Sequence, residues 1–114
     1  MNQFGFCEEL TNTQPLFQYV SNDSIIQVQK NWTTHLGILH GSTLTLQAQQ
    51  SFLDGKKLLL DNGATLVLNN TSINGQSLQP YPGNKIILNN GARILKPFEL
   101  PVGTGLIINN GKIE

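Results

Sequence analysis

A twelve-residue pattern recurs along this chain and constrains its fold more than any other feature of the sequence. The three clearest copies read GKKLLLDNGATL from Gly55, GNKIILNNGARI from Gly83 and GTGLIINNGKIE from Gly103. They begin 28 and then 20 residues apart, and a fainter copy, TTHLGILHGSTL, begins at Thr33. Recurrence at such intervals is typical of a stack of similar units, each packed on its neighbours.

Each copy predicts a short strand, a sharp turn and a second strand. Three consecutive aliphatic residues are too few for a helix and are rich in strand formers. The Asn-Gly pair that follows them readily adopts positive φ, so the chain is expected to turn there. In the faint copy, His40 takes the place of the asparagine. The predicted structural corners are Gly41, Asn62, Gly63, Asn90, Gly91, Asn110 and Gly111.

Two architectures can use such a unit. Asn-Gly can close a hairpin between antiparallel strands, or it can form the corner of a β-solenoid coil whose strands pair in parallel. We favour the solenoid because Gly55, Gly83 and Gly103 each lie eight residues before a turn glycine. Stacked coils must bend at equivalent places, whereas independent hairpins need no such repeat. The intervals between copies, Val67 to Pro82 and Leu95 to Val102, are predicted as loops of unequal length.

The predicted fold is therefore all-β: a parallel β-helix of about four coils over residues 25–114, with residues 1–24 as an N-terminal cap or flanking segment. Aligning the copies predicts three interior columns. These are Leu58 with Ile86 and Leu106, Leu60 with Leu88 and Ile108, and Leu44 with Leu66 and Ile94. The intervening Leu59, Ile87 and Ile107 should then form an outward aliphatic stripe.

Composition excludes several classes of partner. Seven basic and seven acidic residues give a formal net charge of zero, so nothing draws the chain to nucleic acid or to an anionic membrane. No apolar run is long enough for membrane insertion, and no signal peptide is recognisable. The single cysteine, Cys7, cannot form an internal disulfide. Neighbouring domains or further copies of the chain are the expected partners, through the open solenoid end or the outward stripe.

The polar residues give little sign of catalysis. Asp54 and Asp61 flank one strand, which at about 3.3 Å per residue places them roughly 20 Å apart, too far for paired carboxylate chemistry. His35, His40 and Cys7 do not have the spacing of a metal site. We therefore expect no catalytic residue, no metal and no cofactor.

Binding remains the open question. Carbohydrate sites often use aromatic platforms, and Trp32, Tyr81 and Phe98 are candidates, together with Asp54 in a loop. Trp32 fits equally well as a shield for the start of the core. An ice-binding face is disfavoured, because Arg93 follows Thr43 and Thr65 in the aligned column.

The segment from Ile25 to Gly75, IIQVQKNWTTHLGILHGSTLTLQAQQSFLDGKKLLLDNGATLVLNNTSING, resembles the parallel β-helix segments of large secreted and cell-surface proteins of Bacteroidetes. The resemblance covers residues 25–114. It implies a right-handed β-helix, type IX secretion to the cell surface and a larger parent protein with a C-terminal sorting domain.

The expected function is accordingly that of a non-catalytic structural or adhesive β-solenoid module of a larger secreted or cell-surface protein. The alternative is a glycan-binding or polysaccharide-degrading β-helix domain that uses Tyr81, Phe98 and Asp54.

Overall fold

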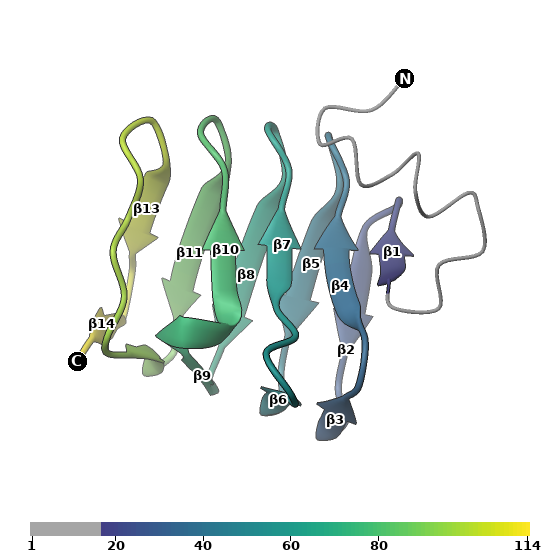
Figure 1. Ribbon diagram of the computed structural model, residues 1–114. Coiled ribbons are helices and arrows are strands. Elements are labelled where there is room, and N and C mark those ends of the chain that lie inside the picture. Colours follow the sequence, from purple (N-terminus) through teal and green to yellow (C-terminus); the bar gives the residue numbers. More distant parts are fainter. Residues whose placement is uncertain (1–16) are drawn as a thin grey trace.

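The computed structural model describes residues 17–114, and these form a parallel β-solenoid of about five turns (Figure 1). Fourteen short strands and one 3-10 turn make up the described chain. They are β1 (Phe17–Val20), β2 (Ser24–Ile26), β3 (Lys30–Trp32), β4 (His35–Ile38), β5 (Thr43–Leu46), β6 (Gln50–Phe52), β7 (Leu58–Leu60), β8 (Thr65–Asn69), β9 (Ser72–Asn74), η1 (Gly75–Ser77), β10 (Leu78–Pro80), β11 (Lys85–Asn89), β12 (Ala92–Leu95), β13 (Gly105–Ile108) and β14 (Gly111–Ile113).

Every strand pairing among the described residues is parallel, which confirms the solenoid and rules out the hairpin alternative. The strands form sheets in the orders β1-β4-β7-β10, β13-β11-β8-β5-β2, β14-β12-β9 and β3-β6. In Figure 1 the near strands β4, β7 and β10 point up, the far strands β5, β8 and β11 point down, and the coils progress from right to left. This is the sense of a right-handed solenoid.

Aliphatic columns fill the interior because inward and outward residues alternate along each strand. Leu44 pairs with Leu66, and Leu66 pairs with Ile86, at separations of 22 and 20 residues. All three side chains are fully buried. The sheet that contains β9 and β12 adds Ile73 and Ile94 to the same core.

The predicted alignment of the repeat copies was wrong for the copy that begins at Gly55. Its first strand, β7, does not pair with β11 of the next copy; the following strand, β8, does. Leu58 pairs with Leu36 and Leu78 rather than with Ile86. Ile86 instead pairs with Leu66, which lies eight residues after Leu58. β7 and β11 lie in different sheets, on different sides of the coil, yet an Asn-Gly pair follows both. The sequence copies therefore look alike although they come from different sides. The segment Val67 to Pro82, predicted as a loop, accordingly contains β9 and β10.

The predicted columns change with this register. Ile86 with Leu106, Leu88 with Ile108 and Leu44 with Leu66 are true neighbours. Leu60 instead pairs with Ile38 and Pro80, in the sheet on the opposite side of the coil. Ile94 pairs with Ile73 and Ile113, beyond the next corner.

The outward stripe also differs from the prediction. Leu59 is buried, at 8% exposure, and lies in a different sheet from Ile87 and Ile107. The true outward column runs across the sheet that contains β2, β5, β8, β11 and β13. Its members are Ile25, Thr45, Val67, Ile87 and Ile107. A threonine interrupts this column, so the aliphatic stripe is less continuous than the sequence indicated.

A ladder of glycines forms the corner between β4 and β5 and its equivalents in later coils. The N–H of Gly41 donates to the carbonyl of Gly63, that of Gly63 to Gly83, and that of Gly83 to Gly103, at 2.9–3.1 Å. All four glycines have φ between 79° and 92°. The second corner column contains Asn90 and Gly91, with φ of 56° and 82°. Gly111 begins β14 and is not among the positive-φ glycines.

Strand pairing begins earlier than predicted. β1 lies inside the segment assigned to the N-terminal cap, yet it pairs with β4 and starts the first coil. This accounts for five turns where about four were expected. Residues 1–16, with Cys7 and most of the predicted cap, lie outside the described residues.

Candidate functional site

A ladder of primary amides runs along the solenoid where the strands of the sheet containing β8 and β11 end. One amide side chain occupies this position in each of the five coils. They are Gln27, Gln47, Asn69, Asn89 and Asn109. Gln27 Nε2 donates to Gln47 Oε1 at 3.1 Å, and Asn109 Nδ2 donates to Asn89 Oδ1 at 2.6 Å. Between these pairs, Asn90 Nδ2 donates to Asn69 Oδ1 at 2.5 Å. These side-chain bonds link the first coil to the second and join the last three coils to one another, outside the backbone ladder.

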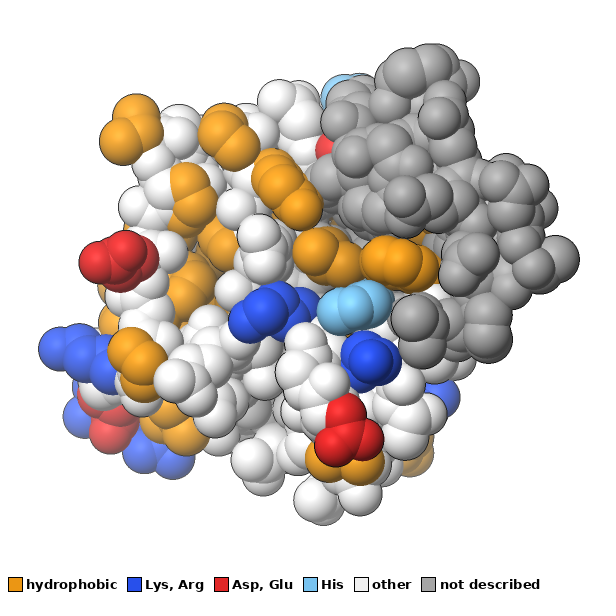
Figure 2. All heavy atoms as spheres, viewed as in Figure 1, with side chains coloured by type: hydrophobic (Ala, Val, Ile, Leu, Met, Phe, Trp, Pro, Cys, Tyr) orange, Lys and Arg blue, Asp and Glu red, His pale blue; other side chains and the backbone are white. Residues whose placement is uncertain are grey.

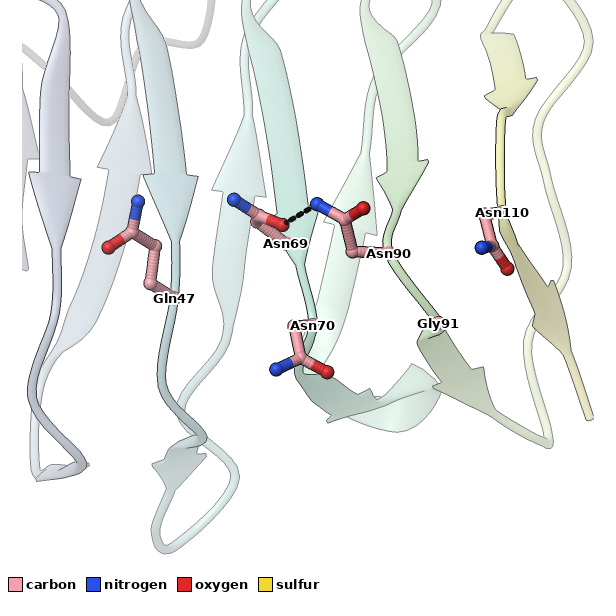
Figure 3. Close-up of a pocket in the computed structure, with 6 residues that line it drawn as sticks. All are labelled: Gln47, Asn69, Asn70, Asn90, Gly91 and Asn110. Carbon is pink, nitrogen blue, oxygen red and sulfur yellow. Dashed lines mark hydrogen bonds between the residues drawn. The ribbon is translucent and has the colours of Figure 1, made fainter.

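A groove on the surface runs beside this ladder, and we call it the amide groove (Figure 3). It has a volume of about 740 Å³ and is lined by Gln47, Asn69, Asn70, Asn90, Gly91 and Asn110. Its side chains are uncharged, so it contains neither a nucleophile nor an acid–base pair. Hydrogen bonding between coils is the chemistry that this arrangement supports best.

Asp61 is the one carboxylate buried in the described core, at 1% exposure. It lies at the glycine corner after β7, where its Oδ1 accepts the N–H of Asn62 at 2.7 Å. Burial raises the pKa of Asp61 above its usual 3.8, although hydrogen bonds from Asn62 and His40 oppose the rise. The pKa of Tyr81 is also raised, chiefly by burial and further by the charge of Asp61.

Replacing Asp61 with asparagine should remove a pH dependence of stability. Since the folded state raises the pKa of Asp61, its contribution is fully present below pH 3.8 and is lost as pH rises toward the folded value. Asn keeps the acceptor for the Asn62 N–H without a charge. We expect the free energy of unfolding of wild type, relative to Asp61→Asn, to fall as pH rises from 3 to 7 in urea titrations.

His35 also makes the free energy of unfolding depend on pH, in the opposite direction. Its contribution is the same in wild type and Asp61→Asn, so it cancels in the difference between them. The pKa of His35 lies below 6.5 because of burial and then the charge of Lys56, so its contribution is lost as pH falls below 6.5. A difference between wild type and Asp61→Asn that is independent of pH would contradict the assignment of Asp61.

The second groove, the loop groove, has a volume of about 710 Å³ and a different chemical character. The loop before β7, the turn η1 and the segment after β12 form it. The residues that line it include Phe52, Lys56, Lys57, Gln76, Phe98 and Glu99. It therefore combines aromatic surface, amide groups and cations, as ligand sites often do.

Close packing holds the loop groove in shape. Phe98 lies directly on Gly75, where an added Cβ would approach Phe98 Cβ to 2.5 Å and the carbonyl oxygens of Leu95 and Pro97 to 2.6 Å. Only glycine allows this approach between η1 and the segment after β12. Lys57 Nζ donates to the Gln76 carbonyl at 2.6 Å, which joins the third wall, the loop before β7, to η1.

The loop groove has a basic side. Lys57 N–H donates to His35 Nδ1 at 3.0 Å, so the imidazole accepts through Nδ1 as its neutral form does. Figure 2 shows basic side chains and a histidine gathered near the centre of this face, over β4, β7 and β10. Within residues 17–114, neither Lys56 nor Lys57 forms a salt bridge; the ion pairs there join Glu114 to Arg93 and Lys112.

The aromatic residues singled out in the sequence have different positions. Trp32 is 5% exposed; its indole N–H donates to Gln50 Oε1 at 2.8 Å, and its ring stacks with Phe52. Lys30 Nζ lies 4.0 Å from its ring centroid, so Trp32 shields the core and offers no ring to a ligand. Tyr81 is partly buried and lines neither groove. Phe98 lines the loop groove.

The remaining candidates do not converge. Asp54 is exposed in the turn before β7, whereas Asp61 is buried after that strand. Within residues 17–114, no group of three metal-binding side chains comes together. The threonine column of Thr43 and Thr65 continues to Lys85 and Gly105 instead of Arg93, so a regular threonine face is again absent from the described coils.

No protein family model, curated protein or solved structure matches this chain. The resemblance to Bacteroidetes surface proteins thus stays a prediction. Among the residues described, no helix has the length and apolar character needed to cross a membrane.

Sequence reasoning missed both grooves. The amides at Gln27, Gln47 and Asn69 recur at 20 and 22 residues, a signal that becomes visible once the true coil register is known. Lys56 and Lys57 are adjacent in the sequence, but nothing local indicates that Gln76 and Phe98 lie beside them.

Proposed function

We propose that this chain is a non-catalytic structural or adhesive module of a larger secreted or cell-surface protein. The observation that carries the proposal is the continuous parallel pairing of the backbone from coil to coil. Backbone pairing links β2, β5, β8, β11 and β13 in one sheet, and the amide ladder follows the same direction. A solenoid of this kind holds its two ends at a fixed separation, because each coil adds about 4.8 Å.

A distance measurement tests the spacer role. Residues 17–114 placed between two fluorescent domains should give a narrow distribution of single-molecule energy transfer. A Gly/Ser linker of the same length should give a broad one, since a flexible chain samples many end-to-end distances. Equal widths would contradict a stiff spacer.

Export is supported by the resemblance of residues 25–114 to secreted β-helix segments. Treating intact source cells with a membrane-impermeant biotin reagent should label the parent protein on its lysines. Labelling only after lysis would contradict the surface location.

The loop groove favours a second candidate, which is glycan binding. Phe98 supplies an aromatic surface, and Gln76 supplies an amide for sugar hydroxyls. Specific binding on a glycan array that is lost in Gln76→Ala would support this function. Gln79→Ala, an exposed amide on β10 outside the groove, is the matched control. A blank array would leave the spacer role as the better account.

A further inference from the structure

We propose that the loop groove binds an acidic oligosaccharide and recognises its carboxylates through Lys56 and Lys57. The proposal rests on the glycan-binding candidate function and adds the charge class of the ligand. Such a site would make the solenoid adhesive, with an affinity that falls as the salt concentration rises.

The first support for the proposal is the net positive charge of the loop groove. Lys56 and Lys57 are adjacent at the rim of β7, and neither has an acidic partner in the structure described for residues 17–114. Among the described residues, Glu99 is the single carboxylate that lines the groove, so the two lysines exceed it in charge. A ligand carboxylate would therefore find an unpaired cation and form a charge-assisted hydrogen bond.

The second support is that one of the two ammonium groups is already held in place before a ligand binds. The bond from Lys57 Nζ to the Gln76 carbonyl fixes that ammonium over the groove. Lys56 makes no such bond within residues 17–114 and can turn toward a ligand. The charges of both lysines also lower the pKa of neighbouring His35, after burial, which is the response expected of a positive local potential.

The remaining lining favours a sugar as the carrier of the carboxylate. Phe52 and Phe98 provide apolar surface for sugar C–H groups. Gln76 and Ser77 provide groups that donate to and accept from hydroxyls. A volume of about 710 Å³ lies in the range of small-ligand sites.

Two probes with the same backbone test the charge requirement. One is a tetrasaccharide of β-1,4-linked glucuronic acid, and the other is cellotetraose, in which hydroxymethyl groups replace the carboxylates. Calorimetry at low salt should give at least about tenfold tighter binding of the acidic probe, and a tenfold rise in salt should weaken it several-fold.

Opposite charge changes in the groove should have opposite effects. Lys56→Gln should weaken binding of the glucuronate probe about fivefold, and Glu99→Gln should tighten it several-fold, because each change alters one charge beside the ligand. Lys85→Gln removes an exposed lysine from β11, outside the groove, and should leave the affinity unchanged. Thermal melts of the three variants should match wild type, since all three positions lie on the surface.

The outcomes separate this inference from the function on which it rests. Equal affinity for both tetrasaccharides, lost in Gln76→Ala, would retain glycan binding and overturn the role of charge. If tetraglutamate binds as tightly as the glucuronate probe, the ligand is not required to be a sugar, and an acidic peptide is indicated instead. Absence of binding to all three probes at millimolar concentration would overturn the proposal altogether.

Discussion

Replacing Leu66 with alanine should lower the free energy of unfolding by about 3–5 kcal/mol. Leu66 is fully buried and stacks between Leu44 and Ile86, so the neighbouring coils hold the space open from both sides. A cavity that cannot collapse adds its own cost to the lost burial of the side chain. Urea unfolding followed by circular dichroism measures the change.

Val67→Ala is the matched control, because Val67 is the next residue on the same strand and faces outward with partial exposure. Its cost should be about 1 kcal/mol, as fewer atoms leave a less buried position. Similar losses in the two variants would mean that β8 does not present Leu66 to the interior.

Replacing Gly63 with valine should lower the free energy of unfolding by about 3 kcal/mol or more, from two causes. Gly63 has a φ of 81°, which a β-branched residue adopts only with strain. An added Cβ would also lie 2.5 Å from His40 Nδ1 and 2.7 Å from His40 Cε1. The imidazole would have to move and release its 2.7 Å contact with the Asn62 carbonyl oxygen.

Gly91→Val separates the two causes. Gly91 has nearly the same φ, 82°, but no atom of the residues that the structure describes lies within 4 Å of its added Cβ. It should lose about 1–2 kcal/mol through backbone strain alone. Combining each glycine substitution with His40→Ala should bring the two losses together; a difference that persists would show that His40 is not the obstacle at Gly63.

The corners show most clearly what the local sequence can predict and what it cannot. Asn62-Gly63 and Asn90-Gly91 both predicted turns, and both pairs lie where the chain changes sheets. Asn-Gly and the aliphatic runs before it act through φ preference and side-chain alternation, which are properties of a few adjacent residues. They predict strands, turns and parallel stacking, but they do not distinguish the corner after β7 from the one after β11.

The same limit explains the misplaced residues. Leu58 and Ile86 have almost the same local sequence, yet Leu58 pairs with Leu78 on one side of the coil and Ile86 pairs with Leu66 on the other. The choice depends on hydrogen bonds between residues about 20 positions apart. Trp32 likewise lost its candidate role through long-range contacts, with Gln50 and Phe52 of the next coil.

By itself, the sequence determined that the chain is a repetitive all-β stack with glycine corners and an aliphatic interior. These features follow from the preferences of single residues and from a periodicity that any alignment of the copies preserves. Only the tertiary structure decided which copies lie over one another, and with that the amide ladder and the loop groove. Both require side chains from different coils to meet, and that meeting depends on the backbone register between coils, which local sequence leaves open.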